Sequence, residues 1–203
     1  MPTGDVIEHK SFNLGMSYGF DFVDSTGGKI PQKGILKYTA NLGAMKGLEL
    51  GLLGQTEKGM DRFKEGVFIN MKYGLASEDA KNPLKLAVGI ENLTSSGEAD
   101  AYLVASQAFK HGYTLHFGAM FDFPDGKFRP LGMVGLTLPF FHGTLEVLSE
   151  LFAGESLLQA DAGVRVMFTN DVGLALNVLN MTNSPVAKNT QSAFVGLSWQ
   201  DPF

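Results

Sequence analysis

The stretch from Phe12 to Phe22, FNLGMSYGFDF, alternates residue by residue between large apolar and small polar side chains. A period of two is typical of an extended strand whose two faces meet different surroundings. Its eleven residues are about the length that a tilted strand needs to cross a bilayer. The polar face holds Gly, Ser, Asn and Asp but no Lys or Glu. This combination favours a wall between lipid and a crowded, wet lumen.

The same alternation recurs along the rest of the chain. It predicts strands at residues 12–22, 35–44, 48–53, 67–75, 84–91, 101–110, 113–123, 134–140, 145–151, 158–168, 172–178 and 193–199. Twelve strands in sequence, each with one apolar face, predict an all-β fold: a closed antiparallel up-and-down transmembrane β-barrel. Residues 1–203 would form this single domain.

The connections between these strands alternate in character. Longer or Gly/Pro-rich connections, such as Asp24–Lys33, are followed by tight ones, except that the fourth is too long for the rule. Long loops at one rim and short turns at the other are typical of outer-membrane barrels, so both termini are expected at the short-turn, periplasmic rim. The two faces of 101–110 are the hardest to distinguish. A two-residue turn at His111-Gly112 would pair Gln107 with His116 and point Tyr102, Val104 and Ala108 outward.

The strand phase sorts side chains into a lumen set and a lipid set. In the seventh strand, Leu115 and Phe117 would face lipid, and His116 and Gly118 the lumen. The ionisable residues expected to line the lumen are Asp21, Lys37, Glu49, Lys72, Lys85, Glu91, His116, Asp122, Glu146, Glu150, Asp161 and Arg165. The aromatic residues expected at the two lipid interfaces are Phe12, Phe20, Phe22, Tyr38, Tyr73, Tyr113, Phe121, Phe123, Phe140, Phe168 and Trp199.

Composition excludes several other classes of protein. The sequence has no run of eighteen apolar residues, so a transmembrane helix is not expected. The net charge of −5 and the lack of a Lys/Arg cluster argue against nucleic acid as a partner. The first residues lack the basic and apolar regions of a signal peptide. We therefore interpret the sequence as a mature protein of the bacterial outer membrane with an added start Met.

No pattern in the sequence predicts catalysis. No Ser motif pairs with His116, and no His/carboxylate cluster has metal-ligand spacing. Glu146 and Glu150 share a face but would lie more than roughly 10 Å apart along the strand, too far for a hydrolase pair. We therefore expect no enzyme activity, no cofactor and no metal.

Three functions fit the predicted barrel. Seven carboxylates against four Lys/Arg in the lumen set favour a narrow pore for small solutes or ions, with a slight cation preference. The alternative is a non-conducting structural barrel whose charge pairs fill the lumen. A soluble β-barrel binding protein is less favoured, because the polar faces of the strands are small and the apolar stripes would need a very large core.

The end of the chain resembles the terminal signal of bacterial outer-membrane barrels. Val195, Leu197 and Trp199 alternate before Phe203, although Asp201-Pro202 departs from that signal. This resemblance implies the lipid bilayer and the outer-membrane insertion machinery as partners. The phrases at 2–6, 10–12, 86–91 and 102–106 are similar to YjbH-type barrels, which implies a component of exopolysaccharide envelopes without established chemistry. The sequence leaves open whether the barrel forms homo-oligomers or binds other proteins of the envelope.

Overall fold

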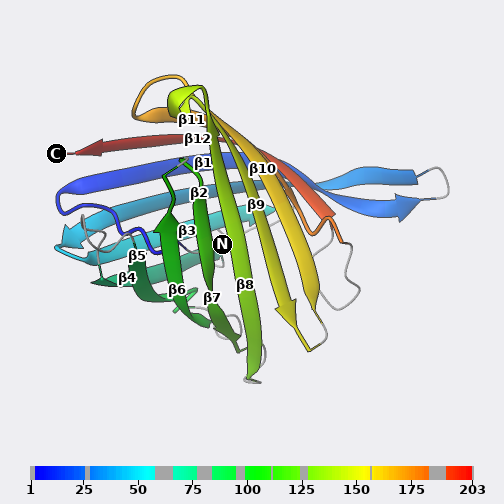
Figure 1. Ribbon diagram of the computed structural model, residues 1–203. Coiled ribbons are helices and arrows are strands. Elements are labelled where there is room, and N and C mark those ends of the chain that lie inside the picture. Colours follow the sequence, from blue (N-terminus) through cyan, green and yellow to red (C-terminus); the bar gives the residue numbers. More distant parts are fainter. Residues whose placement is uncertain are drawn as a thin grey trace.

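The computed structural model describes residues 3–25, 28–57, 66–76, 84–94, 99–110, 112–123, 128–155, 157–182 and 191–202. The described residues form a closed antiparallel barrel in which each strand pairs with its neighbours in sequence and β1 pairs with β12 (Figure 1). The strands are β1 (Ser11–Ser25), β2 (Gly28–Met45), β3 (Leu48–Glu57), β4 (Val67–Ala76), β5 (Leu84–Glu91), β6 (Asp100–Ala108), β7 (Thr114–Asp122), β8 (Arg129–Phe140), β9 (Leu145–Gly154), β10 (Leu158–Met167), β11 (Val172–Leu179) and β12 (Gln191–Pro202). The predicted fold class and the number of strands are therefore confirmed.

The outer face of the barrel is apolar, as the alternation predicts. On β1, Leu14, Met16 and Tyr18 are between 40% and 56% exposed. Phe117 on β7 is 41% exposed, while its neighbour His116 is buried. These apolar side chains point away from the barrel interior, so they are not buried in the core of a soluble protein. An apolar exterior on a closed barrel is typical of a protein surrounded by lipid. Among the described residues, no helix has the length and apolar character needed to cross a membrane.

The first hairpin is longer than predicted. Residues 24–33 were expected to form a loop, but β1 and β2 stay paired out to Ser25 and Gly28. Figure 1 shows this blue hairpin extending beyond the rest of the barrel. A register shift between Phe20 and Phe22 places Pro31 opposite Phe22. The irregular ladder of a bulge tolerates a residue that lacks an N–H, so Pro31 does not end the strand.

The pairing of β6 with β7 corrects one prediction. Ser106, not Gln107, lies opposite His116. The Phe109 N–H donates to the Tyr113 carbonyl, so the turn contains three residues rather than two. Gly112 adopts a positive φ of 88°, which suits the last residue of a three-residue hairpin loop. The extra turn residue moves β6 by one position and exchanges its two faces.

The exchanged face of β6 changes the interior of the barrel. Tyr102 and Val104 were expected to point outward but are 6% and 0% exposed, while Leu103 is 42% exposed. Tyr102 and Val104 form an apolar cluster inside the barrel with residues of β5, β7 and β8. This inner apolar cluster consists of Ala87, Tyr102, Val104, Met120, Leu131 and Met133, with Val6, Phe152 and Leu157 packed against it.

Candidate functional site

The lumen is the candidate functional site, and its most polar wall is formed by β9 and β10. Glu146 and Arg165 are ladder partners on these strands. The Arg165 Nε donates to Glu146 Oε2 over 2.7 Å, and a guanidinium nitrogen donates to the same oxygen. One layer further along, Glu150 and Asp161 are also ladder partners. Two carboxylates facing each other across strands bias this wall toward negative charge.

Asp161 is held in place by donors from its own side of the barrel. Its carboxylate accepts hydrogen bonds from the Gln159 amide at 3.0 and 3.1 Å and from the Asn180 N–H at 2.7 Å. Asp161 is 9% exposed, and Asn180 is 1% exposed. These donors satisfy the buried carboxylate oxygens, which have lost most of their contact with water.

Two hollows open along this wall. A cavity of about 420 Å³ lies by the short turns after β8 and β10, and its lining includes Asn13, Glu146, Arg165, Ser198 and Gln200. A second cavity of about 230 Å³ is lined by residues of β9, β10 and β11: Leu148, Glu150, Asp161, Ala162, Gly163, Asn177 and Leu179. Glu146 lines the first hollow and Glu150 lines the second, and both residues lie on the same face of β9. The two hollows therefore follow each other along β9 and β10. This side of the lumen can hold water and ions.

The wall formed by β12 and β1–β4 carries charged side chains that contact a hydroxyl group, an aromatic ring or an opposite charge. The Ser192 hydroxyl donates to Asp21 Oδ1 over 2.6 Å. The Lys37 ammonium lies 4.3 Å from the centre of the Phe194 ring, within the range of a cation–π interaction. On β3 and β4, the Lys72 ammonium lies 3.0 Å from Glu49 Oε2. Each of these charges is compensated by a near neighbour.

His116 is fixed by hydroxyl groups on both sides of its ring. Nδ1 lies 2.7 Å from Ser106 Oγ, and Nε2 lies 3.1 Å from Thr137 Oγ1. Ser106 is 1% exposed and also accepts a hydrogen bond from the Gly4 N–H at 2.6 Å. The sequence reasoning missed this Ser–His contact because the β6 face was assigned one residue out of phase. Both side chains are covered, so the contact stabilises the interior rather than presenting a nucleophile.

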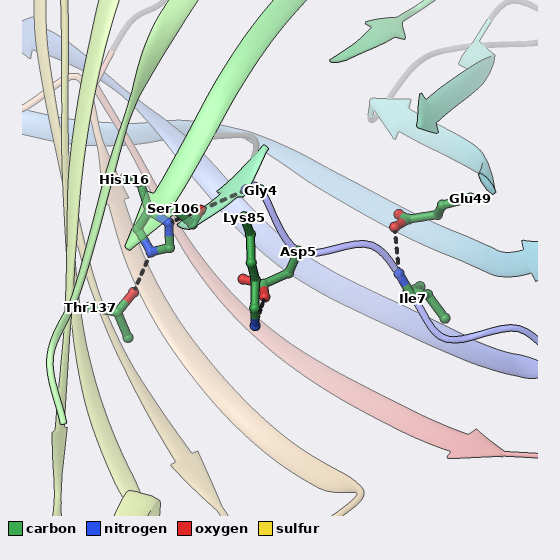
Figure 2. A network of polar contacts seen from close by, with 8 residues as sticks. All are labelled: Gly4, Asp5, Ile7, Glu49, Lys85, Ser106, His116 and Thr137. Carbon is green, nitrogen blue, oxygen red and sulfur yellow. Dashed lines mark hydrogen bonds and ion pairs between the residues drawn. The ribbon is translucent and has the colours of Figure 1, made fainter. Parts of the chain in front are cut away.

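A segment that precedes β1 lies inside the barrel. We call residues 3–10 the strap. Figure 2 shows it following the inner wall from Ser106 on β6, past Lys85 on β5, to Glu49 on β3. Its contacts include the Gly4–Ser106 hydrogen bond, an ion pair of 2.6 Å between Asp5 and Lys85, and a 3.1 Å hydrogen bond from the Ile7 N–H to Glu49. The sequence analysis predicts no strand at these residues, in agreement with the structure. It does not predict that they lie in the lumen.

The structure distributes the predicted lumen set over several clusters rather than one site. Glu91 on β5 is half-buried, and the side chain of Asp122 lies outside the described residues, as does Phe203. Of the predicted aromatic girdle, the rings of Phe12 and Trp199 meet edge to face at 5.1 Å, and Phe121 and Phe123 both contact Phe128. The most exposed girdle residues, at 39–62%, are Phe20, Tyr73, Phe123, Phe140, Phe168 and Trp199. Their placement at a lipid interface stays a prediction.

Metal chemistry has no site in the described part of the chain. Among those residues, no group of three His, Cys, Asp or Glu side chains is arranged to hold a metal ion. The charged groups of the lumen instead bind one another, bind hydroxyl and amide groups, or line the hollows. They can attract, order or exclude ions, which is the chemistry of a channel lining.

A closed twelve-stranded barrel with an apolar exterior and a charged, partly hollow interior defines the class of transmembrane β-barrels. Solved structures of this class resemble it over most of the chain. The NanC porin has a TM-score of 0.62 at 12% identity, covering 92% of this chain and 98% of its own. The KdgM porin has a TM-score of 0.62 at 9% identity with the same coverage. The translocator domain of the autotransporter NalP from Neisseria meningitidis has a TM-score of 0.53 at 10% identity, covering 93% of this chain and 87% of its own.

These similarities concern the fold, because every identity is 12% or lower. No family model and no curated protein matches the sequence. The similarity to YjbH-type barrels finds no support in these comparisons and stays a prediction. The fold is shared by proteins named as porins and by a translocator domain, so the function must be argued from the lumen.

Proposed function

We propose that this protein is a narrow passive pore of the bacterial outer membrane for small solutes or ions. The observation that carries the proposal is the pair of hollows, about 420 and 230 Å³, along the polar wall of β9 and β10. A barrel packed solid by charge pairs would leave no such volume beside Glu150 and Asp161. The structural neighbours named as porins, NanC and KdgM, support the same class of function.

The charges that line the hollows favour cations. Glu146, Glu150 and Asp161 face them, against Arg165, which is bound to Glu146. Carboxylates in a confined and partly dehydrated path lower the energy of a cation and raise that of an anion. The selectivity is expected to be modest, because one carboxylate is neutralised by the arginine.

The permeable cross-section is small. The inner apolar cluster occupies the side of β5 to β8, and the strap covers part of the β3 to β6 wall. The inner apolar cluster and the strap leave the side of β9 to β11, where the two hollows lie, as the path for solutes. Twelve-stranded barrels lie between small barrels filled by side chains and wide porins. Ions and small solutes therefore suit this pore, and large oligomers do not.

A planar-bilayer recording tests the proposal. The purified protein should give discrete conductance steps, and a salt gradient should give a reversal potential on the cation-selective side. The Glu150→Gln variant should weaken this selectivity. The exposed Glu155, beyond the end of β9, supplies the matched control Glu155→Gln, which should leave selectivity nearly unchanged. Absence of conductance steps at any voltage would refute the pore.

The second candidate is a non-conducting barrel that serves envelope or exopolysaccharide assembly, as the YjbH-type resemblance implies. The inner apolar cluster is the observation that favours it, because Val104 and Met133, at 0% and 1% exposed, fill lumen space that a pore does not need. A silent bilayer recording, combined with correct insertion into vesicles, is the result expected for this candidate. Insertion by the outer-membrane machinery, which the resemblance of the C-terminal residues implies, and any homo-oligomer are compatible with either candidate.

A further inference from the structure

The strap is attached to the barrel differently from every strand. Its residues 3 and 5–8 have no regular secondary structure, so its N–H and C=O groups join no ladder. Its contacts with the barrel are separate ones, which include the Gly4–Ser106 hydrogen bond, the Asp5–Lys85 ion pair, the Ile7–Glu49 hydrogen bond and the packing of Val6 against the inner apolar cluster. Segments held by few contacts open more easily than ladders do, because each opening breaks fewer bonds at once.

All of these contacts lie near the rim of the barrel at which β3 and β5 begin and β6 ends. Glu49 and Lys85 are the second residues of β3 and β5, and Ser106 is two residues from the end of β6. Glycines of the same rim make room for the strap. A methyl group added at Gly43 would overlap the Glu8 carbonyl, and one added at Gly74 would lie 3.2 Å from Val6 Cγ2. The strap therefore lies in a seat on the inner wall at one mouth of the barrel.

The strap meets β1 at a turn that can act as a hinge. The Ser11 N–H donates to the Glu8 carbonyl at 3.1 Å, and the Lys10 N–H donates to the Gly43 carbonyl at 3.1 Å. Lys10 has a φ of 65°, a conformation that costs energy for a residue with a side chain. Beyond this turn, Asp5 and Glu8 are exposed and bring two carboxylates to the mouth. Movement at the turn would carry both charges with the strap.

We propose that the strap is a releasable constriction of the pore. When seated, it narrows the lumen at the short-turn mouth and places there the Asp5 carboxylate, paired with Lys85, and the Glu8 carboxylate; when it swings out at Lys10, that mouth widens. This inference rests on the proposed pore function for its effect on conductance. The seating and the release can be measured without any conductance.

An engineered disulfide tests the seating. Val6 Cβ lies 3.9 Å from the position of a Cβ added at Gly74, inside the range of disulfide bonds. The chain has no native cysteine, so Val6→Cys with Gly74→Cys gives one defined pair. The double variant should form the disulfide under mild oxidant in the folded protein, as measured by peptide mass, and the two single variants are the controls. Failure of the folded double variant to cross-link would overturn the seating.

Conductance and hydrogen exchange test the release. In the reduced double variant, the amides of residues 3–10 should exchange faster than those of the barrel ladders, and the disulfide should slow them. The oxidised channel should lose its larger openings, and reduction should restore them. Equal exchange and equal conductance in the two redox states would show that the strap is a fixed part of the wall.

A seat variant provides an independent test. Gly43→Ala should favour the released strap, because its methyl group overlaps the Glu8 carbonyl. Exchange of residues 3–10 should rise and larger openings should become more frequent. Gly132→Ala, on the exposed outer face with its nearest neighbour at 3.7 Å, is the control that should change neither. If Gly43→Ala fails to fold, Lys85→Met removes the ion pair with Asp5 and should act in the same direction.

The two proposals fail in different ways. If no variant gives conductance steps in the bilayer, the pore function is refuted. Hydrogen exchange and disulfide cross-linking then still decide whether the strap is seated and released. Normal conductance with slow exchange at residues 3–10 in the reduced protein refutes the release and leaves the pore intact.

Discussion

Two neighbouring residues of β11 provide a direct test of the barrel faces. Leu176 is 56% exposed on the outer face, and its ladder partners Val164 and Val195 are also exposed there. It lies four residues from the start of β11, which is about 13 Å along the strand and roughly 10 Å in depth for a tilted strand. In an apolar band of about 25 Å this is close to the bilayer midplane. An arginine at this position has no partner on the lipid face.

Leu176→Arg should therefore lower the free energy of unfolding from a bilayer by about 2 to 4 kcal/mol. That difference corresponds to a roughly 30- to 1,000-fold change in the folding equilibrium. Asn177→Arg places the same charge on the inner face, in the hollow that Glu150 and Asp161 also line. These carboxylates compensate the guanidinium, so the change should stay below about 1 kcal/mol.

Denaturant titration of the two variants in phospholipid vesicles measures this contrast. Trp199, the single tryptophan of the chain, lies on the outer face near the short-turn rim and reports insertion through its fluorescence. Leu176→Met is the conservative control and should be nearly neutral. Equal losses in both arginine variants, or a larger loss for Asn177→Arg, would show that the assigned register of β11 is wrong, since one residue of shift exchanges the faces.

Three further substitutions test other parts of the lumen. Ser106→Ala leaves a nitrogen of the buried His116 without its hydroxyl partner, and should cost about 1 to 3 kcal/mol in the same titration; an unchanged midpoint would contradict the contact. Arg165→Met removes the cation beside Glu146, so the reversal potential should shift toward stronger cation selectivity, and no shift would place the pair off the conduction path. Lys10→Gly relieves the positive φ and should stabilise the seated strap by up to about 1 kcal/mol, measured as slower exchange of residues 3–10; faster exchange would contradict the hinge.

The pairing of β6 with β7 shows where local pattern stops being informative. In most strands one face is large and apolar and the other small and polar, so alternation alone predicts which residues face outward. In β6 both faces are apolar or small, from Tyr102 and Val104 to Leu103 and Ala105. Only the backbone of the turn, with Gly112 at a positive φ and three residues in the loop, decides the register. A hairpin register depends on turn geometry that several loop lengths can satisfy.

Gly89 illustrates a second limit of the sequence. Glycines on the inner faces predict space in the lumen, but Gly163, which lines a hollow, is itself covered by the side chain of its ladder partner Asn177. At Gly89, the space is taken by the ring of Tyr102 from the neighbouring strand. Whether a glycine leaves an open volume or accepts a neighbouring side chain depends on which residue lies across the ladder. That relation exists only once the strands are paired.

The sequence by itself determined the number of strands, their antiparallel order and the apolar exterior, because a period of two is a local property that lipid on one side enforces. The tertiary structure decided the register of β6, the inner apolar cluster and the position of the strap. Residues 3–10 carry no periodicity, and their contacts join positions such as Gly4 and Ser106 that lie 102 residues apart. Such contacts depend on the closed shape of the barrel, which brings distant strands around one lumen, and no local pattern encodes them.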